Sequence, residues 1–510
     1  MTEAFARVPA LAAQHLLLAM AALVLALAIG LPLGVRSARS PRVAAVALGG
    51  ASLVQTIPSL ALLALFYPLL LWLSALVGGG IPALGFLPAL LALTLYALLP
   101  IVRNVVTGLA GLDPALLEAA DGIGMTPAQK LRLVEAPLVL PIVMAGVRTA
   151  AVWTIGAATL STTVGQPSLG DLIFAGLQTQ AWALVIAGCV SAAALALTVD
   201  GLLGVAERAA GRRRWPVAWG ALALLAVATV AASAPLWPTG ERDRTVVVGA
   251  KNFSEQYILA RLIGQRLERA GYSVSYRDGL GSAVAFGAVA GGDVDVYVDY
   301  AGTIWTGEMR RRDTPSRARQ VAAIARWAEK SRGVTLLGSL GFENAYAFAM
   351  RGDDARRRGI ATLDDLVASA PTLRFGADLE FLDRAEWAAI RRAYPLRFAA
   401  ATPYSPTFMY RALQSRRADV ISAFSSDGRI AADRLTILTD PKQAIPGYDA
   451  IMLLAPARRH DAPFAAALRP LVSRIDVARM REANYRVDRD RDKQTPEAAA
   501  RWLAARIGLP

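Results

Sequence analysis

The sequence predicts two folds in one chain: an all-α membrane domain with about six transmembrane helices, followed by an α/β domain of two lobes. Apolar residues are concentrated in roughly the first 240 positions, in long Leu- and Ala-rich segments with few charges. From Thr245 onward, short β-rich runs alternate with amphipathic helical patterns, which favours α/β layers with a mostly parallel sheet. About 270 residues exceed what one core comfortably holds, so we expect two lobes.

Six apolar segments can be recognised in the first half, where about 20 apolar residues suffice for one membrane crossing. They lie near residues 11–35, 43–73, 86–110, 138–164, 180–206 and 216–237. Prolines at positions 58, 68, 82 and 88 interrupt the second and third segments, so the boundaries of these two stay open. The first segment is too long, and lacks a cleavage-like flank, for a removed signal peptide.

Basic residues in the connecting loops predict the orientation in the membrane. They follow segment 1 (Arg36, Arg39, Arg42), segment 3 (Lys130, Arg132) and segment 5 (Arg208, Arg212 to Arg214). We therefore expect these three loops in the cytoplasm, with the N-terminus and everything after Pro238 outside. The net charge of +14 includes no basic cluster interleaved with aromatic residues, so we expect no nucleic-acid partner.

A polar insertion between segments 3 and 4 predicts a helical elbow on the cytoplasmic face. Asp113 caps a first helix with Pro114 at its first position, and Gly122 and Gly124 end that helix. Thr126 to Gln129 then form a capping box that opens a second short helix, which we expect to stop before Pro137.

This elbow, at residues 113–140, resembles the EAA loop in the permease subunits of ABC importers. The resemblance is carried by Glu118-Ala119-Ala120, by Gly124 and by Pro137, with Ala136 as a departure where the family usually has Leu. It implies that Glu118, Ala119, Ala120 and Gly124 couple the membrane domain to a separate ATPase. The alternative interpretation is an ordinary cytoplasmic helical hairpin.

The second apolar segment contains polar residues around a proline, in the stretch from Gln55 to Leu63. Such a stretch loosens a helix and offers polar atoms to a protein-lined path. It resembles the signature of permeases in the osmoprotectant branch of ABC importers, which carry glycine betaine, choline or carnitine. The alternative is a simple proline kink whose freed backbone groups are satisfied by neighbouring Ser and Thr.

The soluble half divides into predicted strands and helices that suggest where the chain crosses between lobes. Strands are expected at residues 246–250, 294–298, 373–376, 418–424 and 450–454. We expect a permease domain at 1–214, a last transmembrane helix and linker at 215–240, and a binding domain at 241–510. Lobe one is predicted at 245–343 plus 453–510 and lobe two at 344–452, with crossings near Phe342 and Leu453.

The binding domain resembles the periplasmic substrate-binding proteins of the same osmoprotectant branch, a type II two-lobed fold that goes with a type I permease. The matching stretches are residues 249–256, 297–303, 341–346, 380–384, 423–428 and 446–448. Departures include Ala301 for the usual Thr, Glu343 and Ala345 in the third stretch, and Phe424 for the usual Tyr. They leave the fold expectation intact and leave the ligand open.

A quaternary ammonium has no hydrogen-bond donor and a diffuse charge, so aromatic ring faces hold it best. Tyrosines at predicted element ends on both lobes supply such faces, and by the resemblance they align with cage positions of the family. Arg384 suits a ligand carboxylate, and three polar residues suit the orientation of the ligand. The predicted ligand-binding residues are Gln256, Tyr300, Thr303, Asn344, Tyr346, Arg384, Tyr410 and Tyr448. The alternatives are packing for each tyrosine and a surface salt bridge for Arg384; Tyr297 is expected in the core.

Other chemistries have little support in the sequence. One cysteine and two scattered histidines cannot build a metal cluster of soft ligands, so no metal or cofactor is expected. The sequence has no G-x-S-x-G elbow, H-E-x-x-H or Walker A motif, which disfavours a tethered hydrolase and any ATPase activity of its own.

We therefore expect a transport subunit rather than an enzyme: the permease and substrate-binding parts of an ATP-driven importer for betaine-type osmoprotectants. It would lie in the bacterial cytoplasmic membrane with its binding domain outside. Its partners would be a cytoplasmic ATPase, membrane lipid and a second permease chain, either an identical copy or a different one. The alternatives are a ligand-gated receptor or sensor, and an importer for another small amine, thiol-betaine or amino acid.

Overall fold

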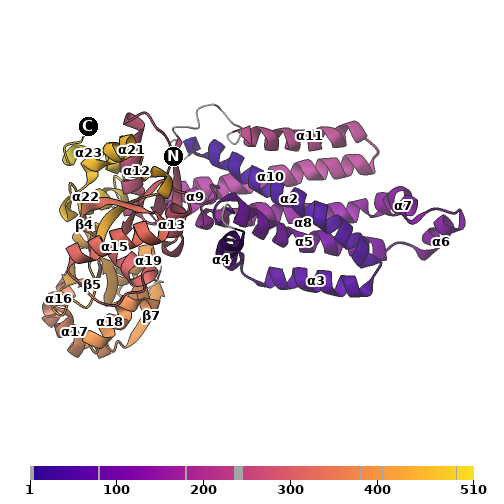
Figure 1. Cartoon of the computed structure of the whole chain (residues 1–510). Helices are drawn as coiled ribbons and strands as arrows, with labels where there is room; N and C mark the ends of the chain where they lie inside the picture. The colour runs from indigo at the N-terminus through magenta and orange to yellow at the C-terminus, as the bar shows by residue number, and fades with distance from the viewer. Residues whose placement is uncertain are drawn as a thin grey trace. The chain divides into compact units, whose positions relative to one another are not determined.

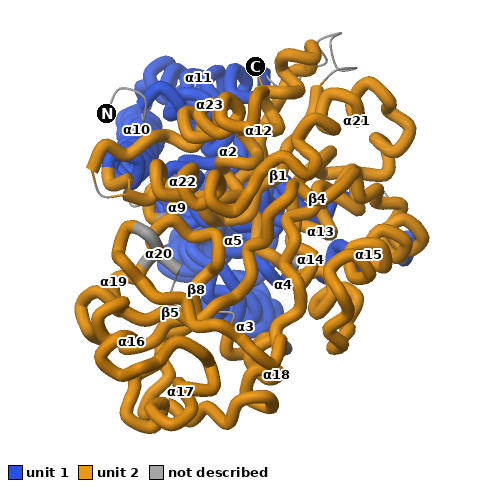
Figure 2. Tube along the Cα trace, turned by 90° about the vertical axis from the view of Figure 1, so that its left-hand side faces the viewer, with its two compact units in different colours: residues 1–173, 183–239 blue, residues 174–182, 240–510 orange. Residues whose placement is uncertain are grey.

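The computed structural model describes residues 5–77, 81–178, 181–234, 245–378, 381–404, 406–489 and 491–509. The chain forms two compact units, one of residues 1–173 and 183–239 and the other of residues 174–182 and 240–510 (Figure 2). The predicted linker at residues 235–240, and Glu380 of the motif at 380–384, lie outside the described residues.

Long apolar helices build the first unit, as the hydrophobic segments predict. Five helices are long and apolar enough to cross a membrane, or up to six if one bent pair counts as a single span, within the described ranges. The helices of residues 5–234 are α2 (Val8–Ala38), α3 (Pro41–Thr56), α4 (Ser59–Leu76), α5 (Phe86–Ala110), α6 (Pro114–Gly122), α7 (Pro127–Lys130), η1 (Leu131–Glu135), α8 (Ala136–Ala158), η2 (Thr159–Val164), α9 (Gly170–Gln178), α10 (Trp182–Gly211) and α11 (Trp215–Ala232). Helices α2, α5 and α8 pack side by side (Figure 1).

The bent pair is α3 and α4, which meet at an angle of 102° at Ile57 and Pro58. Proline disfavours the α conformation at the residue before it, and Ile57 is indeed extended, with φ −73° and ψ 124°. The Tyr96 hydroxyl of α5 donates to the freed Ile57 carbonyl, and Gln55 Nε2 donates to the Tyr96 carbonyl at 3.2 Å. The bend is thus stabilised by a neighbouring helix, as backbone groups at membrane depth require.

The elbow follows its predicted capping chemistry but ends differently. The Asp113 side chain accepts from the Ala115 amide at 2.9 Å, Gly124 has φ +78°, and Thr126 and Gln129 form the capping box. The expected stop before Pro137 is wrong, because α7 continues through the π-helical turn η1 directly into α8. The Ala136 amide bonds back to the Leu131 carbonyl, and this wider turn accommodates a proline that cannot donate.

Two five-stranded sheets form the binding domain and give it the predicted two lobes. The first sheet has the order β2 (Ser273–Leu280), β1 (Thr245–Lys251), β3 (Val296–Tyr300), β10 (Asp449–Leu454) and β4 (Thr335–Glu343). The second has the order β7 (Ala400–Tyr404), β6 (Arg374–Asp378), β8 (Val420–Phe424), β5 (Tyr346–Arg351) and β9 (Leu435–Leu438). Pairing is parallel except around β10 and β5, each of which runs antiparallel to both neighbours.

The chain crosses between the sheets twice, between β4 and β5 and between β9 and β10. The second crossing therefore precedes Asp449, and the expected crossing near Leu453 is wrong. Residues Asp449 to Met452 pair with β3 and β4 of the first sheet, although the sequence placed them in lobe two. A strand that is apolar after its first residue, as β10 is, fits either sheet, and only the long-range pairing decides between them.

Helices complete both lobes (Figure 1). Those with the first sheet are α12 (Ser254–Arg269), α13 (Ser282–Ala290), α14 (Ala301–Thr303), η5 (Ile304–Glu308), α15 (Arg317–Arg332), η8 (Pro456–Arg458), α21 (Ala462–Leu468), η9 (Arg469–Leu471), α22 (Val477–Asp488) and α23 (Pro496–Arg506). Those with the second are α16 (Gly352–Arg358), α17 (Leu363–Ser369), η6 (Ala370–Thr372), η7 (Phe381–Asp383), α18 (Ala385–Ala393), α19 (Pro406–Gln414) and α20 (Arg429–Ala432).

Candidate functional site

A cavity of about 140 Å³, here called the aromatic cavity, lies where strand ends and chain crossings of the two lobes meet. Tyr300, Asp378 and Phe424 are the last residues of β3, β6 and β8, the edge where ligands of α/β sheets commonly bind. Asn344 and Tyr346 stand at the first crossing. The cavity is lined by Lys251, Asn252, Phe253, Ser282, Tyr300, Thr303, Asn344, Tyr346, Asp378, Arg384, Phe424 and Tyr448.

Five aromatic rings follow one another along the wall of this cavity. The centroid of Phe253 lies 6.1 Å from that of Tyr300 and 6.5 Å from that of Phe424. Tyr346 continues the series, 5.1 Å from Phe424 and 5.9 Å from Tyr448. A continuous wall of ring faces offers the negative π-surface that attracts a diffuse cation.

Buried carboxylates hold two of the tyrosines by their hydroxyls. Tyr300 Oη donates to Glu255 Oε1 at 2.6 Å, and Tyr448 Oη donates to Glu386 Oε1. Burial raises the pKa of both phenols well above the ordinary value, so both stay neutral. Glu386 of α18 also accepts from Thr306 Oγ1 at 2.9 Å, and therefore joins the second lobe to two residues of the first.

The charged residues that line the cavity are Lys251, Arg384 and Asp378. Lys251 Nζ is buried and lies 2.5 Å from Asp299 Oδ1, which neutralises its charge. The guanidinium of Arg384 lies 5.5 Å from the centroid of Tyr346, and its Nε donates to Tyr346 Oη at 3.3 Å. Asp378 lines the same space and accepts from the Phe381 amide at 3.2 Å. The cavity thus offers one acidic and one basic side chain beside its rings.

Six of the eight predicted ligand-binding residues line the aromatic cavity: Tyr300, Thr303, Asn344, Tyr346, Arg384 and Tyr448. Gln256 does not, because its Nε2 donates to Tyr300 Oη and to the Val298 carbonyl, both at 3.0 Å. Gln256 therefore positions the Tyr300 hydroxyl without lining the cavity itself.

Tyr410 is not brought to the cavity either. It is buried with Met409 and Leu413 of α19, the Arg429 guanidinium lies 4.0 Å from its ring centroid, and the Phe424 amide donates to its hydroxyl at 3.4 Å. The four-tyrosine cage is therefore replaced by three tyrosines and two phenylalanines.

The residues that sequence reasoning missed carried a usable signal. Phe253 stands inside the stretch 249–256, and Phe424 was noted only as a departure from Tyr, although the substitution keeps the ring. Asp378 comes two residues after the strand predicted at 373–376, at the end of a sheet strand where ligands of α/β folds commonly bind. Lys251 and Asn252 stand in the same stretch as Phe253, whereas Ser282 carried no comparable signal.

The elbow is the second predicted functional region, and its residues differ in exposure. Glu118, Ala119 and Gly124 are exposed, whereas Ala120 is buried. Lys130 of α7 pairs with Asp121 of α6 at 2.7 Å, which ties the two helices together. Ile123 is 74% exposed between them, so the elbow presents an apolar side chain to a partner or to solvent.

Two known families together account for nearly the whole chain. Residues 244–505, about half of the chain, match the substrate binding domain of ABC-type glycine betaine transport systems. Residues 30–212 match the binding-protein-dependent transport system inner membrane component.

Curated relatives repeat this division. The ergothioneine transport permease/ergothioneine binding protein EgtU of Helicobacter pylori is 28% identical over 95% of this chain and 88% of its own length. The choline transport system permease protein OpuBB of Bacillus subtilis is 42% identical over 38% of this chain and 84% of its own length. A solved structure described as a glycine betaine/carnitine/choline ABC transporter is 26% identical, with a TM-score of 0.46, and covers 51% of this chain and 98% of that chain.

The relatives are transport proteins rather than enzymes, and the apolar helices make this a multi-pass membrane protein. The chain belongs to the ABC-type glycine betaine transport family, and joins an inner-membrane permease component and a substrate-binding domain in one polypeptide.

Proposed function

We propose that this chain is the permease and substrate-binding subunit of an ATP-driven importer for quaternary ammonium compounds, betaines in particular. The observation that carries the proposal is the wall of five rings in the aromatic cavity, with Asp378 and Arg384 beside it. Each contact between a ring and the ammonium contributes roughly 0.5–2 kcal/mol, and Arg384 suits the carboxylate that distinguishes a betaine from choline.

Names of relatives support the betaine class and differ within it. Permease relatives are named for choline, carnitine and glycine betaine, whereas a relative that aligns over 95% of the chain is named for ergothioneine. A thiol-containing betaine is therefore the second candidate.

The energy source and the assembly follow from the elbow. The sequence carries no Walker A motif, so ATP would be hydrolysed by a separate cytoplasmic ATPase. That ATPase would bind the elbow at Glu118, Ala119, Ala120 and Gly124. Each chain has one such elbow and an ABC importer has two ATPase sites, so two permease chains would assemble, as identical copies or with a different partner. The bacterial cytoplasmic membrane would hold them, with the binding domain outside.

Calorimetry on the full-length chain in lipid nanodiscs tests the ligand class. Choline and glycine betaine should bind, and the neutral tert-butyl analogue of choline should bind about tenfold more weakly or worse, since about 1.4 kcal/mol is tenfold. Equal binding of the charged and neutral analogues, or a preference for an anionic or apolar ligand, would count against the proposal.

Arg384 separates betaines from choline in the same assay. Arg384→Ala should weaken glycine betaine by about tenfold or more and leave choline nearly unchanged, because a charge-assisted hydrogen bond contributes about 1.5–3 kcal/mol. Arg391→Ala is the matched control, because Arg391 is an exposed arginine on α18, the helix that begins directly after Arg384, and does not line the cavity. An equal loss of affinity for glycine betaine and choline would indicate that Arg384 stabilises the structure of the lobe and does not bind the carboxylate.

A further inference from the structure

A charged cluster lies deep inside the membrane domain, where side chains of α8 meet those of α10. Arg148 is the only charged residue of α8, and it stands about 18 Å along that helix from Ala136. Asp200 stands about 17 Å along α10 from Gly211. Because the hydrocarbon core of a bilayer is about 30 Å thick, both charges lie well inside the apolar part of their helices. Ionisable residues at such depth are costly, and those that occur usually serve a function.

The carboxylates of α10 grip the guanidinium of α8 from two sides. Arg148 donates from Nε to Asp200 Oδ1 and from Nη2 to Asp200 Oδ2, both at 2.8 Å. Its Nη1 donates to Glu207 Oε2 at 3.1 Å. Asp200, Gly204 and Glu207 follow one another at helical spacing, so they share one face of α10. These three residues and Arg148 are here called the α8–α10 clamp.

Gly204 leaves the space that the guanidinium occupies. A Cβ at this position would lie 3.2 Å from Arg148 Cζ and 3.4 Å from both terminal nitrogens. Gly201, about one turn earlier on the same helix, is exposed, and a Cβ there would meet no atom within 4 Å. A branched side chain at position 204 would therefore displace the guanidinium from its carboxylates, whereas the same side chain at position 201 would leave it in place.

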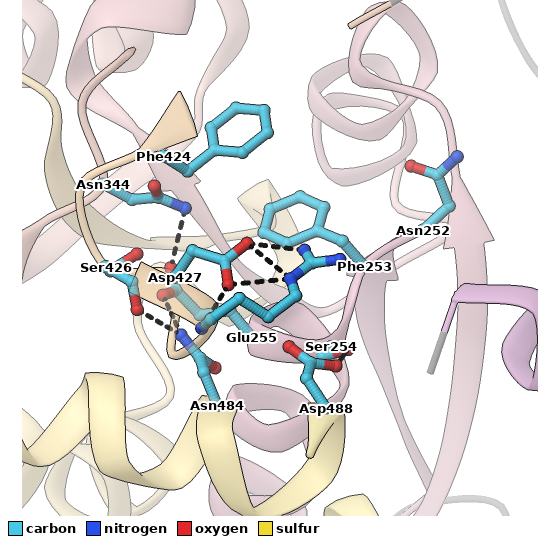
Figure 3. A pocket seen from close by; sticks show the side chains of 11 residues that line it. Asn252, Phe253, Ser254, Glu255, Asn344, Phe424, Ser426, Asp427, Asn484 and Asp488 are labelled. Atoms are coloured by element: carbon cyan, nitrogen blue, oxygen red, sulfur yellow. Dashed lines mark hydrogen bonds and ion pairs between the residues drawn. The ribbon is translucent and has the colours of Figure 1, made fainter. Parts of the chain in front are cut away.

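The clamp joins two elements that are far apart in the chain. In the binding domain, by contrast, the buried guanidinium of Arg429 pairs at 2.5 Å with Asp427 of the same short stretch (Figure 3). Beside the clamp, Val147 of α8 and Leu203 of α10 belong to one core cluster. Charge-assisted hydrogen bonds and apolar packing thus fix the two helices to each other.

Through α8, the clamp is also connected to the elbow. Helices α7, η1 and α8 form one uninterrupted helical segment, so Arg148 lies on the same rigid element as the second half of the elbow. Helix α10 follows α8 only after η2 and α9. The contacts of Arg148 therefore give α10 a link to the elbow that does not pass through the intervening chain.

We propose that the clamp makes α10 move together with the elbow during transport, with Arg148 as the positioning residue that connects them. This inference rests on the proposed function and adds the element to which the motion of the elbow is passed. Without the clamp, the elbow would still bind its ATPase and α8 would still shift, but α10 would not follow. Transport would then fail while the binding domain kept its affinity for the ligand.

Spin labels test the attachment of the two helices directly, without ligand or ATPase. Cys189 is first replaced by Ser, and labels are placed at Leu138 of α8 and Leu197 of α10, which are both exposed. Pulsed electron paramagnetic resonance on this full-length chain in nanodiscs should give one narrow distribution of distances between the labels. Arg148→Gln should broaden that distribution. An unchanged distribution would show that the clamp does not hold the helices together, and the inference would be wrong.

Uptake of glycine betaine in cells tests the consequence for transport. Arg148→Gln and Gly204→Val should each reduce uptake by about tenfold or more, with protein level in the membrane and ligand affinity unchanged. Gly201→Val is the matched control and should transport like the wild type. Reversal of the pair, by Arg148→Asp together with Asp200→Arg, should restore most of the uptake, because the ion pair forms again with the opposite polarity.

The results separate this inference from the proposed function. If glycine betaine is transported and Arg148→Gln transports it normally, the clamp has no role in coupling. If uptake, protein level and affinity all fall together in both single variants, the clamp only stabilises the fold, and the inference is again wrong. If the wild type transports no quaternary ammonium compound, the proposed function is wrong, and the distances between the spin labels still decide whether the clamp attaches α10 to α8.

Discussion

At the scale of single residues, the aromatic cavity depends on ring faces and much less on phenol hydroxyls. The hydroxyls of Tyr300 and Tyr448 are already engaged by Glu255 and Glu386, and Phe253 and Phe424 have none. A Phe at position 424 therefore supplies the same ring face to the wall as a Tyr would.

Alanine substitutions should therefore be costly where phenylalanine substitutions are mild. For Tyr300, Tyr346, Tyr448, Phe253 and Phe424, each change to Ala should reduce ligand binding by about 1–3 kcal/mol, through lost cation–π attraction and lost burial. Tyr→Phe at the three tyrosines should cost less, because the ring remains. Calorimetry with glycine betaine measures both series.

Tyr410→Phe is the control for this series. The ring of Tyr410 lies in the core of lobe two and not in the cavity wall, so binding should not change. If the Ala variants of the five wall residues fold and bind glycine betaine with wild-type affinity, these rings contribute to packing and not to ligand binding.

Asp488 gives the binding domain a dependence on pH. Burial raises the pKa of its carboxyl from 3.8 to about 6, although Arg429 opposes the shift. The folded state therefore holds a proton that the unfolded state has lost between about pH 4 and pH 6, and stability falls as pH rises through that window. Above pH 6 the folded domain carries the full cost of the buried charge.

Asp488→Asn removes this titration. Thermal unfolding of the full-length chain should show a smaller loss of stability from pH 4 to pH 7 in the variant than in the wild type. Asp353→Asn, at an exposed carboxylate 77% accessible in its side chain, is the control and should follow the wild type. If the stability of the Asp488 variant and that of the wild type changed with pH in parallel, the titration of Asp488 would not be the cause of the pH dependence.

At the scale of elements, the elbow is joined rigidly to the helix that follows it. Helices α7, η1 and α8 form one uninterrupted helical segment, so a displacement of α7 would pass directly into the membrane helix α8. Residues 123–126 separate α6 from this segment, and Gly124, with φ +78°, makes the sharp turn among them. Glycine adopts that conformation without the strain that a Cβ would bring.

Gly124→Asp should therefore reduce uptake strongly in cells and leave the ligand affinity of the purified chain unchanged. Gly122→Ala is the matched control, because Gly122 is helical and a Cβ there would meet no atom within 4 Å. Uptake assays and calorimetry measure the two effects separately. A parallel loss of uptake and affinity in Gly124→Asp would show general misfolding instead of lost coupling.

At the scale of the whole molecule, the basic loops agree with the packing of the first unit. Arg39, after α2, pairs with Glu135, before α8, at 3.3 Å, so the first basic loop and the elbow lie at the same end of the helices. One membrane face for both loops is what the distribution of positive charge predicts.

A protease added outside spheroplasts should therefore cut within residues 241–510 and spare the elbow at 113–140. Permeabilised cells, in which both regions are accessible, provide the control, and immunoblots with tags at each end identify the fragments. Protection of the binding domain in intact spheroplasts would reverse the orientation.

The sequence by itself determined the features that depend on neighbouring residues. Apolar length set the spanning helices, Pro58 set the bend between α3 and α4, and Thr126 with Gln129 set the capping box. The alternation of strands and helices likewise determined the α/β class of the second half, because each signal lies within one turn or one strand.

The tertiary structure alone decided which of these pieces meet. It placed β10 in the first sheet and continued the helix through Pro137. It also placed Phe253 and Phe424, and not Tyr410, in the wall of the aromatic cavity. It also brought Asn344 and Asn484 onto Glu255 from positions far apart in the chain. Such contacts depend on strand pairing and helix packing between distant segments, and no local pattern encodes which face of an apolar element will find which partner.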